Sequence, residues 1–296
     1  MNRETIAAIA TPLGTGGISI VKISGPEAVA AVVPLFRPRN PQRKLQHLPT
    51  QTMIYGHIHH PGNGLLIDEV LLTILKEPRS YTGEDIVEIN CHGGLQVTTA
   101  ILDLLLQSGM RLAEPGEFTR RAFLNGRIDL TQVEGTIDLI HARTRRAARL
   151  GSQMMAHGLG VEIQRLADIV NELRALVEAA IDFGDDIEGA APDMSLRDRI
   201  TSELRSPVEN LLRHYHDGRL LREGLRVVLA GKPNVGKSSL MNQLLNHERA
   251  IVTDVPGTTR DTIEESIQIN GIPIRICDTA GLRSSDDPLE RMGCLL

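Results

Sequence analysis

The stretch that decides the fold is Gly231-Lys-Pro-Asn-Val-Gly236-Lys237-Ser238, which matches the phosphate-binding pattern G-x-x-x-x-G-K-[ST]. The apolar run before it, Leu225 to Ala230, is typical of a buried strand, and Ser239 to Leu245 is typical of a helix. A loop between such a strand and helix points backbone N–H groups at phosphate oxygens. We therefore predict a nucleotide-phosphate site, with Lys237 at the outer phosphates and the Ser238 hydroxyl on Mg²⁺.

A second motif downstream belongs to the same predicted site. The short apolar run Pro273 to Cys277 ends in Asp278-Thr-Ala-Gly281, and an Asp at the end of a strand suits a magnesium shell. Between the two motifs, the polar loop Gly257-Thr-Thr-Arg-Asp261 carries hydroxyls that suit the same ion. The alternative is a Gly-rich turn in an unrelated α/β domain. The Asp-Thr-Ala-Gly motif favours a GTPase over an ATPase.

Bulk properties limit the class of protein. At 296 residues the chain is long enough for two or three domains with their own cores. Its net charge of −5 argues against nucleic-acid binding through bulk charge, while local basic patches stay open. The three cysteines, Cys91, Cys277 and Cys294, indicate neither a disulfide framework nor a zinc site. With neither a secretion signal nor a bilayer-length apolar run, we expect a cytoplasmic protein without a membrane partner.

Residues 1–118 predict an α+β N-terminal domain. Short β-type runs cover residues 5–11, 18–23, 53–58, 70–75 and 86–89. Helices are expected from Pro26 to about Phe36 and from Gln96 to about Ser108, where Gly109 follows.

Residues 119–219 predict an all-α helical domain. Thr131 and Glu134 form a capping-box pattern, and apolar residues between Val161 and Ile181 recur at helical spacing. After the polar loop at 184–192, Ser195 is expected to cap a helix that runs to about Leu221.

Residues 220–296 predict an α/β P-loop domain that is incomplete. No Asn-Lys-x-Asp segment for reading guanine is present, and only residues 282–296 follow the second motif. A protein ending here should bind GTP weakly, discriminate poorly against ATP and hydrolyse it poorly, and extension should restore these properties. Val227, Val228, Ile274 and Ile276 would then be exposed on the sheet.

The ordered motifs resemble those of the MnmE (TrmE) family of bacterial and organellar tRNA-modification GTPases. In the N-terminal part, the resemblance rests on residues 10–17 (ATPLGTGG), 81–85 (YTGED), 92–94 (HGG), 115–125 (PGEFTRRAFLN) and 129–132 (DLTQ). In the G domain, it rests on residues 220–224 (LLREG), the P-loop, 257–261 (GTTRD) and 278–283 (DTAGLR).

The resemblance implies an N-terminal domain that dimerises and binds a 5-formyltetrahydrofolate-type carrier, and a G domain inserted into a helical domain. It implies a homodimer that hydrolyses GTP and acts in a heterotetramer with MnmG (GidA), a protein that contains FAD. Together they modify C5 of the wobble uridine of tRNA with aminomethyl-type groups. The family's G domain needs K⁺ and works when two G domains face each other.

The resemblance also implies roles for residues of the G domain. K⁺ would be held by Asn234 with oxygens around Thr253, Val255 and Thr258, and Mg²⁺ by Ser238 and Thr259. Leu282 stands where Ras-like proteins carry a water-positioning Gln, and Glu290 matches the family's water-orienting glutamate, so the implied catalytic residues are Glu290, Asn234 and Lys237. Without the family pattern, Glu290 would be an ordinary solvated carboxylate. The implied nucleotide-binding residues are Asn234, Val235, Gly236, Lys237, Ser238, Ser239, Thr253, Asp254, Val255, Pro256, Gly257, Thr258, Thr259, Asp278, Thr279, Ala280 and Gly281.

For folate, the positions that match the family are Lys22, Glu88 and Arg127. Two cations and a carboxylate could pair with a glutamate tail and hydrogen-bond a pterin ring. The family usually has Arg where Lys22 stands, and Lys keeps the charge but lacks the bidentate fork. Taken singly, each of these residues would more often be a surface or strand-end residue.

Two other groupings are weighed against plainer interpretations. Cys91 and His92 are adjacent on a predicted strand, so they point to opposite faces and should not act as a nucleophile–base pair. The basic cluster Arg143, Arg145, Arg146 and Arg149 could meet tRNA phosphates, and the alternative is a solvated helix face.

Three hypotheses of function follow. The first is a GTPase of the MnmE type. The second is a folate-binding dimerisation module without GTPase activity, and the third is an Era-like ribosome-assembly GTPase. The third would share the P-loop but would leave residues 1–118 unexplained.

Overall fold

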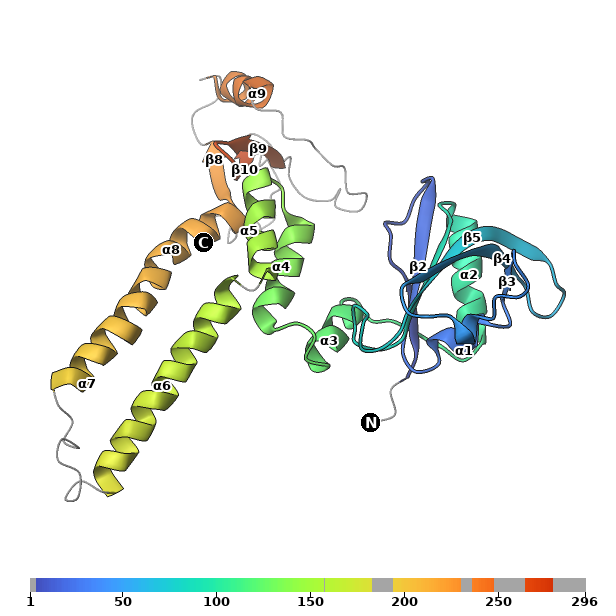
Figure 1. Ribbon diagram of the computed structural model, residues 1–296. Coiled ribbons are helices and arrows are strands. Elements are labelled where there is room, and N and C mark those ends of the chain that lie inside the picture. The colour runs from blue at the N-terminus through green and yellow to red at the C-terminus, as the bar shows by residue number, and fades with distance from the viewer. Residues whose placement is uncertain (1–3, 157, 183–193, 230–235, 248–263, 279–296) are drawn as a thin grey trace, which may run out of the picture. The chain divides into compact units, whose positions relative to one another are not determined.

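The computed structural model describes residues 4–156, 158–182, 194–229, 236–247 and 264–278. The chain divides into two compact units, Met1–Val133 and Glu134–Leu296. The predicted fold class is confirmed: a sheet domain is followed by a helical region and by part of a P-loop domain with a mixed sheet (Figure 1). The first unit extends beyond residue 118 because helix α3 (Glu117–Leu124) forms ion pairs with Arg111, at the start of the last strand of the sheet, and with Glu84 in a loop of the same unit.

The first unit is built on a mixed sheet. Its strands are β1 (Ile6–Ile9), β2 (Ile18–Ser24), β3 (Phe36–Pro38), β4 (Thr52–His59), β5 (Leu66–Leu75), β6 (Ile86–His92) and β7 (Arg111–Leu112). Their order is β3-β4-β5-β6-β2-β1-β7, and each neighbouring pair is antiparallel except β1 and β7. The five predicted β-type runs are therefore all confirmed, with shifted ends.

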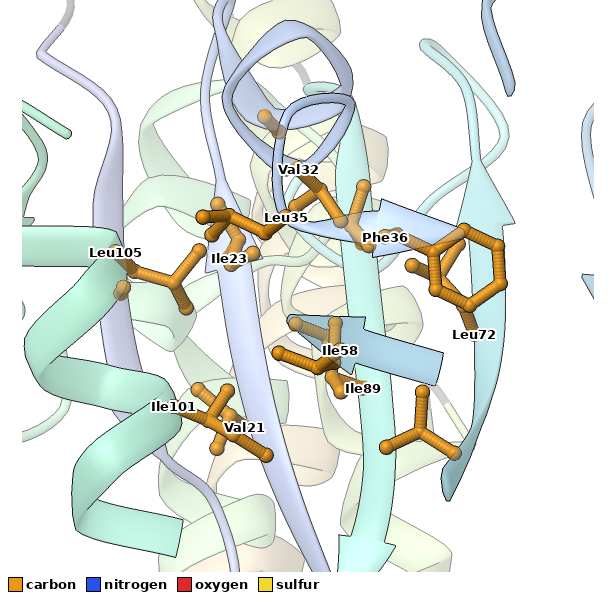
Figure 2. Close-up of a cluster of buried hydrophobic side chains, with 14 of the residues drawn as sticks. Val21, Ile23, Val32, Leu35, Phe36, Ile58, Leu72, Ile89, Ile101 and Leu105 are labelled. Carbon is orange, nitrogen blue, oxygen red and sulfur yellow. The ribbon is translucent and has the colours of Figure 1, made fainter. Parts of the chain in front are cut away.

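One face of this sheet carries the hydrophobic core. Side chains alternate between the faces of a strand, so Val21 and Ile23 of β2 are buried while Lys22 between them faces the other way. Helices α1 (Ala28–Val32) and α2 (Leu95–Gln107) supply Val32, Ile101 and Leu105 to the same cluster (Figure 2). The opposite face is therefore the one that is left for polar side chains.

The predicted helix from Pro26 to Phe36 is wrong in its second half. Helix α1 ends at Val32, and Phe36 begins β3, where it pairs with Ile58 of β4. Pro34 has no N–H to continue the helix, and the aromatic ring gains more from the sheet core, where it is buried. The predicted helix from Gln96 to Ser108 is confirmed as α2, and Gly109 follows it with a φ of 93°.

The predicted cap at Thr131 and Glu134 is also wrong. Helix α4 (Leu130–His141) is capped by Asp129, whose Oδ1 accepts a hydrogen bond from the Gln132 N–H at 2.9 Å. The Gln132 side chain accepts in turn from the Asp129 N–H at 3.0 Å, which completes a capping box two residues earlier. Thr131 donates to Asp129 and so supports this cap instead of forming its own.

The helical region continues with α5 (Arg145–Met155) and α6 (Gly158–Asp182). The predicted helix from Ser195 to Leu221 is confirmed as α7 (Met194–Arg199), a π-helical turn η2 (Ile200–Arg205) and α8 (Ser206–Glu223). The predicted cap is wrong, because α7 begins at Met194 and Ser195 lies inside its first turn. The π-helical turn precedes Pro207, which lacks the N–H that a regular helix would need there. On α6, Leu166 and Leu173 of the predicted stripe are buried, whereas Val170 and Leu176 are half exposed in the described structure.

The P-loop part contains β8 (Leu225–Leu229), α9 (Lys237–His247), β9 (Glu264–Ile269) and β10 (Ile272–Asp278). The sheet order is β8-β10-β9, with β10 parallel to β8 and antiparallel to β9. Val228 is exposed as expected, but the expectation for Ile276 is wrong, because its side chain is buried. Within the described residues, none of the helices has the length and apolar character needed to cross a bilayer.

Candidate functional sites

The strands and helix of the P-loop motif are in the arrangement that the sequence predicts. Strand β8 leads into the motif, and α9 begins at Lys237, with the Leu240 N–H donating to the Gly236 carbonyl at 2.9 Å. In the parallel pair of β8 and β10, Asp278 lies level with Leu229. The backbone of Asp278 therefore lies at the same sheet edge as the start of the phosphate loop, which is the position that a magnesium-shell aspartate needs.

Two glycines shape this region. Gly236 has a φ of 94°, a left-handed conformation that residues with a Cβ rarely adopt, at the point where the loop turns into α9. At the other end of the strand, a Cβ on Gly224 would approach the Pro273 carbonyl too closely, since Gly224 packs directly on the beginning of β10. Only glycine permits both the turn and this approach.

Much of the predicted nucleotide site falls outside the described residues. The positions concerned are Asn234, Val235, Thr253, Asp254, Val255, Pro256, Gly257, Thr258, Thr259, Thr279, Ala280, Gly281 and Glu290. Lys237, Ser238 and Ser239 are described at the start of α9, and Asp278 at the end of β10. The roles of these residues stay predictions.

The polar face of the N-terminal sheet holds the predicted folate residues. Lys22 on β2 and Glu88 on β6 are directly opposite in the strand register, and the Lys22 Nζ lies 3.1 Å from the Glu88 Oε1. The Lys22 ammonium also lies 4.9 Å from the centre of the Tyr81 ring and 5.7 Å from that of Phe118. The two charged side chains are 18% and 27% exposed, so a ligand could still reach them.

Arg127, which follows α3, contacts the loop between β5 and β6 (residues 76–85), which also carries Tyr81. Its Nε donates to the Ser80 carbonyl at 2.6 Å, next to Tyr81. The Tyr81 hydroxyl lies 2.9 Å from the Thr119 hydroxyl, and the Asn125 amide donates to the Thr82 carbonyl at 2.7 Å. The structure thus joins Lys22 to Glu88 directly and connects Arg127 to them through the Ser80–Tyr81 segment.

A buried ionic network that includes Glu84 of this loop was not predicted from the sequence. Glu84 is buried and accepts hydrogen bonds from the Ser24 hydroxyl at 2.9 Å and from Arg121 at 3.0 Å. Arg121 also bonds Glu117, which is 2% exposed and is held by Arg111 through both carboxylate oxygens. Glu84 comes from the quoted signature 81–85, and Glu117 and Arg121 come from the signature 115–125, so the ion pair between Arg121 and Glu84 ties the two segments together. The usable signal was Glu117 and Arg121 in the second signature, which lie four residues apart, at the spacing of an ion pair on a helix.

The pKa of Glu117 shows the strength of this network. Burial of the carboxyl group favours its neutral form, but hydrogen bonds from Arg111, from the Glu114 N–H and from Arg121 outweigh that effect. Together they lower the pKa of Glu117 to about 2. The carboxylate is therefore ionised at every physiological pH, in a role that fixes structure.

Cys91 and His92 behave as the strand alternation predicts. Cys91 is buried and its thiol donates to the Ser19 carbonyl at 3.4 Å, and burial raises its pKa. His92 is 70% exposed on the other face, where its Nδ1 lies 2.7 Å from Asp68. This hydrogen bond raises the pKa of His92. The two residues do not form a catalytic pair, and within the described residues no three His, Cys, Asp or Glu side chains are grouped to hold a metal ion.

Comparisons with known proteins give matches for both the N-terminal unit and the P-loop part of the chain. Residues 5–127 match the family described as "GTP-binding protein TrmE N-terminus", and residues 226–293 match the family described as "50S ribosome-binding GTPase". Across 294 residues, the chain is 48% identical to the "tRNA modification GTPase MnmE" of Carboxydothermus hydrogenoformans. The chain is similar to members of the MnmE family over almost all of its own length.

Relatives with the same printed name extend this finding. The protein of Geobacillus kaustophilus is 49% identical over 292 residues, and that of Bacillus subtilis is 46% identical over 293 residues. Each alignment covers 98% or 99% of this chain, whereas the chain spans 63% of the length of each of these relatives. Residues 5–127 match the TrmE N-terminal family, and the hypothesis of an Era-like ribosome-assembly GTPase does not account for this match.

Proposed function

We propose that this chain binds GTP and hydrolyses it to GDP as part of the modification of tRNA. The observation that carries the proposal is the identity of 46–49% across at least 98% of the chain to relatives named tRNA modification GTPase MnmE. The strand–loop–helix arrangement of β8 and α9, with Asp278 at the same sheet edge, supports it independently.

In the proposed nucleotide site, Gly236 and Lys237 hold the phosphates, and Ser238 and Thr259 hold Mg²⁺. Asn234, with oxygens around Thr253, Val255 and Thr258, holds K⁺. A monovalent cation beside the phosphates supplies positive charge where negative charge develops in phosphoryl transfer. Glu290 orients the attacking water.

The proposed second ligand is a reduced folate on the polar face of the N-terminal sheet. The Glu88 carboxylate can accept hydrogen bonds from a pterin ring, and Lys22 and Arg127 can pair with the carboxylates of a glutamate tail. Support comes from the half-buried ion pair of Lys22 and Glu88 beside the Tyr81 ring, which offers an apolar surface next to charged groups.

The proposed partners follow from the family. The chain acts in the cytoplasm as a homodimer and joins an FAD-containing MnmG subunit in a heterotetramer that modifies C5 of the wobble uridine. The proposed domain limits are 1–118 for folate binding and dimerisation, 119–219 for the helical domain and 220–296 for the G domain.

A turnover assay separates this proposal from its rival, a folate-binding dimerisation module without GTPase activity. GTP hydrolysis is measured with Mg²⁺ in KCl and in NaCl at equal ionic strength, and the readout is the ratio of the two rates. We expect faster turnover in KCl, and we expect Asn234→Ala to abolish the ratio while GTP binding persists. Lys237→Ser should remove turnover in both salts, because it removes the cation that holds the outer phosphates.

The outcomes differ in what they exclude. Equal rates in both salts would refute the proposed K⁺ site, and turnover that survives Lys237→Ser would refute the phosphate site. Absence of turnover in both salts, together with folate binding, would establish the rival.

A further inference from the structure

The segment from His141 to Arg149 is the most one-sidedly charged part of the described helices. It contains His141, Arg143, Arg145, Arg146 and Arg149 and no Asp or Glu, in a chain whose net charge is −5. All of these side chains are exposed. The three on α5, Arg145, Arg146 and Arg149, form the arginine patch.

The arginine patch differs from most other arginines of the described helices of the second unit in having no ion-pair partner. In the described part of the chain, none of its three side chains forms an ion pair or hydrogen bond with another residue. By contrast, Arg174 pairs with Glu178, Arg205 with Glu209 and Arg219 with Glu223, each four residues apart on its helix. Exposure alone does not explain the difference, because Arg174 and Arg205 are each 70% exposed.

The position of the patch is unfavourable for the isolated helix. Arg145 and Arg146 are the first two residues of α5, where the helix dipole favours acidic side chains, and the first turn contains none. Arg145 and Arg149 are four residues apart and repel each other. A helix face whose only task is solubility would not need this arrangement, so a role outside the fold is indicated.

The helix that carries the patch is firmly placed. Thr144 caps α5 by accepting from the Ala147 N–H at 3.1 Å, and the side opposite the arginines is buried at Ala147 and Gly151. A Cβ on Gly151 would lie only 2.7 Å from the Leu139 backbone, because α4 and α5 pack backbone to backbone there. The patch is therefore presented on a rigid element, as a binding surface requires.

We propose that the arginine patch binds the phosphate backbone of RNA. Guanidinium groups suit phosphate oxygens, and α5 (Arg145–Met155), which carries the patch, contains no aromatic side chain on which a base could stack. Contacts of this kind position RNA without reading its sequence. The choice of RNA over an acidic protein surface rests on the proposed function, since the relatives are named tRNA modification GTPases.

The test is a salt titration of binding to a fluorescently labelled, unmodified tRNA transcript, followed by anisotropy with the whole chain. In the patch variant, Arg145, Arg146 and Arg149 are all replaced by Gln. Each lost phosphate contact reduces the slope of log affinity against log salt by about 0.7 to 0.9. We expect a slope smaller by about 2 and an affinity at least about tenfold lower at 0.1 M salt.

Two further variants separate local from general effects. The matched control replaces the paired arginines Arg174, Arg205 and Arg219 by Gln, which removes the same charge from the same unit and should leave the slope within experimental error. A patch variant with Lys at all three positions keeps the charge and should retain most of the affinity. Thermal melting should give the Gln patch variant a Tm equal to or above that of the parent chain.

Several results would overturn the proposal. If the parent chain does not bind the transcript at low salt, or if both Gln variants weaken binding equally, the patch is not an RNA site. Unchanged RNA binding in the patch variant would point to an acidic protein surface instead. A lower Tm would show a structural role for the arginines. RNA binding is measured without GTP turnover, so a negative result in this titration would not refute the proposed GTPase activity, which the turnover assay tests separately.

Discussion

Replacing Glu117 by Gln should destabilise the N-terminal unit strongly and in a pH-dependent way. The Glu117 carboxylate is 2% exposed and accepts from Arg111 at 2.6 and 3.0 Å, from Arg121 at 3.0 Å and from the Glu114 N–H at 2.8 Å. Glutamine keeps the size of the side chain but removes the charge that these donors stabilise. Of their ion pairs, Arg111 would keep the one with Glu4, and Arg121 would keep the one with Glu84.

The magnitude follows from the pKa of Glu117, which falls from 4.5 to about 2 in the folded protein. A carboxyl group with a lowered folded pKa stabilises the fold above its unfolded pKa, and this stabilisation is lost as the pH falls toward the folded pKa. The difference corresponds to about 3 kcal/mol at pH 7 and to about 1 kcal/mol at pH 3. The gap in unfolding free energy between the parent chain and Glu117→Gln should shrink accordingly.

Urea denaturation at pH 7 and pH 3, followed by tyrosine fluorescence, measures this gap. Tyr55 and Tyr81 report on the N-terminal unit. The matched control is Glu114→Gln, because Glu114 is 60% exposed and pairs with Arg120 at the surface, where an ion pair contributes about 0 to 1 kcal/mol. Equal destabilisation by both variants, or a gap for Glu117→Gln that does not change with pH, would refute the reasoning.

Two more predictions concern the same unit. Arg127→Ala should weaken binding of a formyl-tetrahydrofolate in isothermal titration calorimetry, because it removes a cation and frees the Ser80 carbonyl beside Tyr81; unchanged affinity would show that the predicted site is wrong. The chain should also be a dimer in light scattering, with twice the monomer mass of 32.4 kDa. A strictly monomeric mass at high concentration would count against the proposed homodimer.

Local patterns were enough to predict the elements that place the nucleotide site. The run before the P-loop forms β8, α9 follows it, and the run before Asp278 forms β10, because strand and helix periodicity and glycine positions act over a few residues. Strand β9 was missed, although Asn270-Gly271 was a usable signal. Both residues have positive φ, 51° and 80°, as a two-residue hairpin turn requires.

Competition between neighbours decided the details at element ends. Thr131 matches a cap as well as Asp129 does, and only the paired hydrogen bonds between Asp129 and Gln132 select the start of α4. Phe36 suits a helix by spacing, but the core gained by pairing with Ile58 places it in β3. Sequence patterns alone do not predict where these elements begin and end, because the boundaries depend on which residue forms the better hydrogen bond or is more deeply buried.

The sequence by itself indicated the resemblance to the MnmE family, the order of the sheet, helical and P-loop parts, and the phosphate-loop motif, since these depend on short motifs that act locally. Only the tertiary structure decided that Lys22 meets Glu88 beside Tyr81, and that Glu84, Arg121 and Glu117 form one buried network. The same holds for the arginine patch, whose side chains have no ion-pair partner among the described residues, unlike Arg174, Arg205 and Arg219. The physical reason is that ion pairs and burial join residues far apart in the chain, so their strength is set by the fold that brings them together.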